Sequence, residues 1–391
     1  MQSASIKLFR DFFLSDPDVV VQSPGRINII GEHTDYNEGF VLPAAIDKFV
    51  YIAIQKREDQ KLCLYSTEFN QHFETELENL SSQKGHWSNY VLGVLPQLIK
   101  TGYSVSGLNV LIDGDIPIGA GLSSSAAVEC AAIFALNELF QLDLTKIEMI
   151  RIAQKAEHEF AGVLCGIMDM FASVYGKKDY AICLDCRSLS YQYIPMTLHD
   201  HKLVLFNTNV KHNLASSAYN ERRQQCEQGV AWVKEHRPGV QTLRDVTIPM
   251  LDQYVLPKDE VVYRRCKYVI EENMRLLMAC EDLNQKNLLS LGRKMSATHE
   301  GLSKDYEVSC AELDLLIQLV KNNSNVLGAR MMGGGFGGCT INLVKENAIE
   351  QLVNKVSKNY LKQTGLECSH YVVSIANGTS VVENHSEVLQ S

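Results

Sequence analysis

The chain has 391 residues, more than one hydrophobic core usually serves, so two domains are expected. Its net charge of −9 argues against a nucleic-acid-binding surface, and no apolar run approaches the ~18 residues of a membrane span. The first residues lack the apolar core of a signal peptide, so we expect a cytoplasmic protein that acts on neither nucleic acid nor membrane.

Strand-like alternation comes first along the chain, at residues 19–21, 50–54, 61–65 and 107–113. An alanine-rich helix is predicted at 123–140, followed by a helix at 147–160 and strands at 180–184 and 202–207. The rest is more helical, at 218–236, 259–281, 285–303 and 311–322, before a glycine-rich loop and strand at 328–344. This order predicts an α+β protein with domains at 1–200 and 201–391.

The eleven cysteines are scattered, mostly beside apolar residues, and are interpreted as reduced and buried. Cys183 and Cys186 form one C-x-x-C. No second pair completes a structural zinc site, and a redox role is the weaker reading.

The segment 25–37, GRINIIGEHTDYN, changes abruptly from an apolar stretch to a run of directional polar groups. Glu32 and Asp35 offer acceptors, and His33 offers a donor or an acceptor. That set suits a small hydroxyl-rich molecule such as a sugar, and Arg26 suits a phosphate. The alternative is a strand that runs into a capped turn.

The segment 117–127, PIGAGLSSSAA, joins two glycines to three serines where the alanine-rich helix begins. Gly119 and Gly121 let backbone N–H groups approach an anion, and the helix N-terminus favours a phosphate. The alternative is a glycine turn with a serine N-cap. No lysine follows, so the segment is not a P-loop.

A second glycine run, at 333–338, formally matches G-x-G-x-x-G but precedes a β-prone segment. A dinucleotide fingerprint needs a helix there, so that reading fails. The run indicates close backbone approach to a ligand or to another chain segment.

Two carboxylates stand out. Asp169, among apolar neighbours in CGIMDM, would suit a general base if a cation lay beside it, although a helix-terminal aspartate is the simpler reading. Glu157 and a serine hydroxyl together suit magnesium. Trp87 and Tyr90 could flank a flat base or pack in a core, and Tyr219 has a polar setting.

Together these motifs resemble the galactokinases, members of the GHMP small-molecule kinases. The resemblance rests on GRINIIGEHTDYNEGFVLP, PIGAGLSSSAA and GARMMGGGFGG, with weaker likenesses in WSNY, CGIMD, LASSAYNERRQQCE and YEVS. It implies an N-terminal domain like domain 2 of ribosomal protein S5, a ferredoxin-like C-terminal domain, and a site in the cleft between them.

The resemblance also implies residue roles. Asp169 would be the catalytic base, and Arg26 would hold it ionised and stabilise the transferring phosphoryl. The run Glu32, His33, Thr34 and Asp35 would contact the sugar, together with Gly166 and Tyr219. Phosphates would be wrapped by Ile118, Gly119, Ala120, Gly121, Leu122, Ser123, Ser124 and Ser125, and adenine lined by Trp87 and Tyr90. Ser124 and Glu157 would bind Mg²⁺. Met170 stands where the family usually has glutamine.

The expected activity is ATP-dependent phosphorylation of α-D-galactose at its anomeric hydroxyl. The alternatives are an N-acetylgalactosamine kinase, a non-catalytic sensor of galactose and ATP, or a kinase for mevalonate or homoserine, which the Glu32–Asp35 run disfavours. The oligomeric state is expected to be a monomer or weak dimer.

Overall fold

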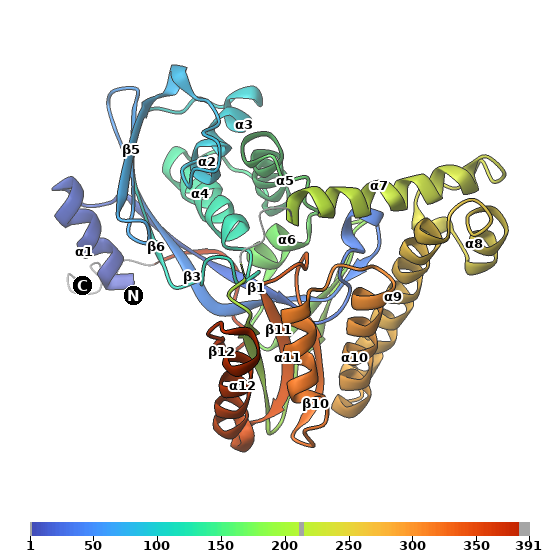
Figure 1. Ribbon diagram of the computed structural model, residues 1–391. Coiled ribbons are helices and arrows are strands. Elements are labelled where there is room, and N and C mark those ends of the chain that lie inside the picture. The colour runs from blue at the N-terminus through green and yellow to red at the C-terminus, as the bar shows by residue number, and fades with distance from the viewer. Residues whose placement is uncertain (1, 211–214, 383–391) are drawn as a thin grey trace.

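The computed structural model describes residues 2–210 and 215–382, which form three sheets and surrounding helices (Figure 1). The six-stranded sheet has the order β13 (Ser380–Val381), β1 (Val19–Asn28), β3 (Pro43–Lys56), β6 (Leu108–Gly114), β4 (Lys61–Ser66) and β5 (Gln71–Glu76). The four-stranded sheet is β10 (Val326–Met331), β11 (Cys339–Lys345), β9 (His201–Asn207) and β12 (Ser369–Val373). The three-stranded sheet is β2 (Phe40–Val41), β7 (Tyr180–Asp185) and β8 (Tyr191–Pro195).

The α-helices of the described residues are α1 (Gln2–Phe13), α2 (Asn89–Leu92), α3 (Val94–Lys100), α4 (Ser124–Phe140), α5 (Lys146–Ala156), α6 (Met168–Tyr175), α7 (Ala215–Lys234), α8 (Ile248–Tyr254), α9 (Glu260–Asn284), α10 (Leu288–Lys304), α11 (Ala311–Lys321) and α12 (Ile349–Thr364). Short turns of helix lie at η1 (Asp35–Asn37), η2 (Leu77–Asn79), η3 (Glu157–Ala161), η4 (Leu243–Asp245) and η5 (Glu346–Ala348). None of the helices in this part of the chain is long and apolar enough to cross a membrane.

Helix α4 lies at the centre of the first half, packed on β1 and β3 of the large sheet (Figure 1). A helix that is apolar on nearly all sides is typically buried, and the alanines of α4 allow this close packing. Helix α1 covers the opposite face, where Phe9 packs with Val20, Ala53 and Leu111. The large sheet is therefore covered on one side by α4 and on the other by α1.

Strand β9 shows how the second half is built. Val204 and Phe206 face a cluster formed with α11 and α12, whereas Leu203 and Leu205 belong to the main core that also contains the large sheet. This period of two follows from the alternation of side chains along a strand. One continuous core thus joins both halves, and the predicted division near residue 200 stays a prediction.

The α+β class is confirmed, as are strands and helices at all the predicted places within the described residues. Several boundaries differ by a few residues, and among the helices the largest difference is at the one expected to run to residue 160, which ends at Ala156 and is continued by η3 as a turn of π-helix. Leu214, at the start of the LASSAYNERRQQCE likeness, lies outside the described residues.

Candidate active site

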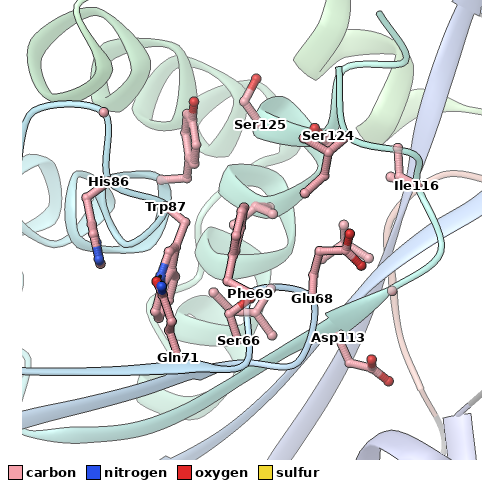
Figure 2. A pocket seen from close by; sticks show the side chains of 17 residues that line it. Ser66, Glu68, Phe69, Gln71, His86, Trp87, Asp113, Ile116, Ser124 and Ser125 are labelled. Carbon is pink, nitrogen blue, oxygen red and sulfur yellow. The ribbon is translucent and has the colours of Figure 1, made fainter. Parts of the chain in front are cut away.

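The first cavity lies between the large sheet and the N-terminal end of α4, with a volume of about 360 Å³. Predicted nucleotide residues from distant segments meet here, namely Trp87, Tyr90, Ile118, Ser124 and Ser125. Figure 2 shows Trp87 with Gln71 at one end and Ser124 at the other. The Trp87 indole donates to Gln71 (3.1 Å) and lies nearly parallel to the Phe69 ring, at 11°. The first cavity thus has an apolar end at Trp87 and Phe69 and a polar end at the N-terminus of α4.

The glycine–serine segment reaches α4 through left-handed backbone. Gly119 and Gly121 have φ of +74° and +73°, and Ser123 has φ of 58°. Glycine adopts these values without a Cβ penalty. The Ser123 side chain does not cap α4; its hydroxyl donates to Asp169 Oδ2 at 2.6 Å. Ala120 and Leu122 are buried and anchor the segment, whereas Ile118, Ser124 and Ser125 line the cavity.

A second cavity of about 170 Å³ lies beside this segment. The predicted residues that line it are Arg26, Glu32, His33, Asp35, Glu157, Gly166, Asp169 and Tyr219. They come from β1, η1, η3, α6 and α7, and the glycines Gly333 and Gly334 join them from the loop after β10. Gly333 and Gly334 thus border this cavity, whereas Gly335 packs on another chain segment, where a Cβ would lie 2.1 Å from the Val308 carbonyl oxygen.

Asp169 and Arg26 form the polar centre of the second cavity. Arg26 Nε donates to Asp169 Oδ1 (2.7 Å) and Nη2 to Oδ2 (2.9 Å), a bidentate pair. Arg26 Nη1 also donates to the Gly121 carbonyl at 2.5 Å. Burial lowers the pKa of Arg26, but the charge and hydrogen bonds of Asp169 more than offset this and raise it. Asp169 lies in the first turn of α6, where the helix dipole also favours a carboxylate.

His33 is buried and lines the second cavity with a neutral imidazole ring. Burial lowers the pKa of His33 to about 3. Its Nδ1 lies 2.8 Å from the Tyr36 hydroxyl, which lies 2.8 Å from that of Tyr306. The buried Nε2, near Gly334, has no partner with hydrogen-bonding geometry among the described residues. The two tyrosines thus fix one ring nitrogen and leave the other for a ligand.

Glu32 is tied on one side to the second half of the chain. Its Oε1 accepts from Gly333 N (2.8 Å) and from Arg330 Nη2 (3.1 Å), and both side chains of this ion pair are buried. Such a pair is held by its additional hydrogen bonds. Arg330 also donates to the Ile29 carbonyl, so β10 is locked to the end of β1.

Asp35 and Gly166 touch. A Cβ at position 166 would lie 1.8 Å from Asp35 Oδ2, so only glycine fits there. Burial, together with the charge of Asp169, raises the pKa of Asp35 to about 7. The Tyr219 ring completes this wall, 5.4 Å from His33 and 5.2 Å from Tyr36 between centroids.

Thr34, expected among the sugar contacts, is placed elsewhere. It is fully buried, and its hydroxyl lies 2.6 Å from the Phe40 carbonyl and 3.0 Å from that of Gly31. It does not line the cavity. A buried hydroxyl that satisfies the backbone of its own turn shapes the run without contacting a ligand.

Ser124 and Glu157, expected to bind Mg²⁺ together, line different cavities. The Ser125 hydroxyl, not that of Ser124, donates to Glu157 Oε1 at 2.9 Å, and the Cys165 thiol donates to Oε2 at 3.2 Å. Neighbouring helical residues point about 100° apart, so only one serine can face Glu157. Ser125 lines the first cavity and Glu157 the second, so this oxygen pair spans both. Burial raises the pKa of Glu157.

Four contributors were not anticipated: Arg330, Tyr36, Tyr306 and, as the partner of Glu157, Ser125. Arg330 carried a usable signal, because a fully charged side chain inside a buried strand needs a partner. The tyrosines carried none, since their hydroxyl contacts depend on the fold. Met170 is buried in the main hydrophobic core.

The fold and these cavities define a small-molecule kinase of the GHMP class. Residues 89–177 match the model of the GHMP kinases N-terminal domain, and residues 279–362 match that of the GHMP kinases C-terminal domain. A mevalonate kinase structure has the same fold, with a TM-score of 0.63 at 19% identity.

Within that class the match is closer still. Residues 7–56 match the galactokinase galactose-binding signature. Galactokinases of Clostridium beijerinckii and Fusobacterium nucleatum are 41% and 40% identical, over 95% and 97% of this chain and 96% and 99% of theirs. The Lactococcus lactis galactokinase complexed with galactose has a TM-score of 0.92 at 37% identity, covering 97% of this chain and 99% of that one. The chain belongs to the galactokinase family.

Proposed function

We propose that the chain transfers the γ-phosphoryl group of ATP to the anomeric hydroxyl of α-D-galactose, giving galactose 1-phosphate and ADP. The observation that carries this proposal is the Asp169 carboxylate of the second cavity, held by Arg26 and by Ser123, whose neighbours Ser124 and Ser125 line the first cavity. A base at that position faces a sugar on one side and phosphates on the other.

The first cavity takes ATP. Its base rests at the Trp87 end, which is the apolar end, and its phosphates rest on the segment 118–125 and the N-terminus of α4. Positioning and charge stabilisation supply most of the catalysis of phosphoryl transfer, so a rigid cradle of this kind suits the reaction.

The second cavity takes galactose. Glu32, His33, Asp35 and Tyr219 offer the acceptors and donors that sugar hydroxyls need, and Asp169 accepts the proton of the attacking hydroxyl. Arg26, buried against Asp169, lies where negative charge develops on the transferring group.

Ser125 and Glu157 are the residues that fit Mg²⁺. The cation prefers oxygen donors, keeps several waters, and is bound through one or two carboxylates plus phosphates, so one hydroxyl and one carboxylate between the two cavities suit it. Bound there, it would neutralise charge on the phosphates of ATP. No group of three or more His, Cys, Asp or Glu in the described chain forms an all-protein metal site.

A cytoplasmic location also stays a proposal. All eleven cysteines are free, which suits a reducing compartment.

The test is ADP release over a panel of galactose, N-acetylgalactosamine, mevalonate and homoserine. We expect turnover with galactose and at least tenfold lower kcat/KM with the others. No release with galactose would refute the proposal. Binding of galactose and ATP without release would instead indicate a sensor, and faster release with N-acetylgalactosamine would change the substrate.

A further inference from the structure

A third cavity lies far from the chemistry, between α10, α11 and β10, with a volume of about 580 Å³. Helices α10 and α11 both pack against β10 but leave a groove between them. The size falls within the range of small-molecule sites. The lining contains no Phe, Tyr or Trp, so a hydrophilic ligand suits it better than an apolar one.

The two walls of the groove are fixed to each other. Gly292 of α10 and Gly328 of β10 lie against each other. A Cβ on Gly292 would lie 2.2 Å from the Leu327 carbonyl oxygen, and a Cβ on Gly328 would lie 2.1 Å from the Gly292 carbonyl oxygen. At the far end of the same strand, His299 Nδ1 accepts from Met331 N at 3.3 Å. Helix α10 therefore runs alongside β10 in the same direction, and the groove has two distinct ends.

One end is cationic. Helix α11 leads into β10 within a few residues, so Lys321, at the end of α11, lies near the start of β10, as Arg293 does beside Gly292. Neither Arg293 nor Lys321 has an ion pair or a hydrogen bond with any residue that the structure describes. The third cation of the lining, Lys304, is paired with Glu300 at 2.5 Å. Two cations without an ion-pair partner among the described residues thus line the groove near the start of β10, and the charge of Lys321 also acts on Glu300 of the same lining.

The other end is built for hydroxyl groups. His299 Nε2 lies 3.3 Å from Asp314 Oδ1, and the Asp314 carboxylate accepts from Ser303 (3.1 Å) and Ser309 (2.6 Å). Six helical residues separate Arg293 from His299, or about 9 Å along the axis. That separation is comparable with the length of a phosphorylated monosaccharide.

We propose that this third cavity binds a phosphorylated sugar, with the phosphate between Arg293 and Lys321 and the hydroxyl groups at the His299–Asp314 end. Arginine and lysine are side chains that bind phosphate, and the carboxylate and imidazole groups at the other end offer hydrogen bonds to sugar hydroxyls. The site goes beyond the proposed function, which enters only through the choice of galactose 1-phosphate as probe.

The experiment is calorimetric titration of the full chain with galactose 1-phosphate. During the titration a saturating non-hydrolysable ATP analogue fills the first cavity, and saturating galactose fills the second. We expect one remaining site per chain. The double variant Arg293→Ala/Lys321→Ala should weaken this binding at least tenfold. The matched variant Arg237→Ala/Lys258→Ala, which also loses one arginine and one lysine from the surface, should leave it unchanged.

Inorganic phosphate should bind the same site at least tenfold more weakly than galactose 1-phosphate. The proposal is overturned if the blocked wild-type chain binds no galactose 1-phosphate, if Arg293→Ala/Lys321→Ala binds it as tightly as wild type, or if inorganic phosphate binds equally well. ADP release is measured on the same preparations. If the chain turns over galactose but binds no galactose 1-phosphate in the third cavity, only this inference is refuted. If the chain is inactive with galactose, the proposed function is refuted instead.

Discussion

The Asp169 carboxylate is held from two sides, by the Arg26 guanidinium and by the Ser123 hydroxyl. The arginine comes from β1 and the serine from the segment before α4, so two elements that line different cavities converge on one side chain. A base fixed in this way loses little entropy when the substrate arrives.

Replacing Asp169 by Asn removes the proton acceptor and keeps the size of the side chain. We expect kcat to fall by at least about 10²-fold, because a positioned base contributes roughly that much or more. Galactose affinity, measured by calorimetry, should change little. Asp200→Asn, an exposed site, serves as control. Near-normal turnover in Asp169→Asn would remove Asp169 from the base role.

Asp35 should reveal a conflict between stability and binding. Its pKa is raised to about 7 by burial and by Asp169, so the folded state holds this proton more tightly than the unfolded state. Stability from this group is full below about pH 4 and is lost as the pH rises through about 7.

Asp35→Asn removes the ionised form and should therefore raise the free energy of unfolding of the ligand-free protein at pH 8, by roughly 1–4 kcal/mol. The same variant should gain little at pH 4 and should bind galactose more weakly at pH 8. Urea denaturation at the two pH values measures the first effect. An equal gain at both values would contradict the assigned cause.

At the scale of elements, the loop between η3 and α6 is shaped by the contact of Gly166 with Asp35. Gly166→Ala would place a methyl group 1.8 Å from Asp35 Oδ2 and must displace that carboxylate. We expect kcat/KM for galactose to fall at least tenfold while KM for ATP holds. Gly239→Ala, where a Cβ meets nothing within 4 Å, is the matched control. A rise in KM for ATP of similar size would indicate general misfolding.

The sequence was most informative where composition alone implies chemistry. The serines before an alanine-rich helix predicted part of the lining of the first cavity, and the polar run after β1 predicted Glu32, His33 and Asp35 of the second. The sequence could not tell which serine contacts Glu157, because Ser124 and Ser125 are alike in composition and differ only in their direction on the helix. Strands β5 and β8 escaped notice because they carry mainly polar or exposed residues.

At the scale of the molecule, the second cavity draws on residues from Arg26 to Gly334 and exists only when both halves are packed together. The continuous core across β9 makes that packing rigid. Neither half, expressed alone, would retain a complete sugar site. The periodicity of the sequence could not predict that both halves form the sugar site, because the site depends on contacts between distant segments.

The return of the chain to the large sheet should contribute measurably to stability. The buried Thr379 hydroxyl lies 2.8 Å from that of Ser23 and donates to the Ser173 carbonyl at 2.9 Å. Thr379→Val should lower the free energy of unfolding by about 1–3 kcal/mol, because the Ser23 hydroxyl is left buried without this partner. Urea denaturation measures it, with Thr197→Val, an exposed site, as control. Equal midpoints for both variants would contradict this.

Strand β13 also bears on how the protein is made. It covers the outer edge of β1 through residues as far apart in sequence as Gln22 and Ser380, a separation of 358. At translation rates of ~5–20 residues per second, that edge waits about 20 to 70 seconds on the ribosome for its partner. An uncovered strand edge is a template for association with other chains. The nascent protein thus passes through a long interval in which this edge of its first strand lacks its partner.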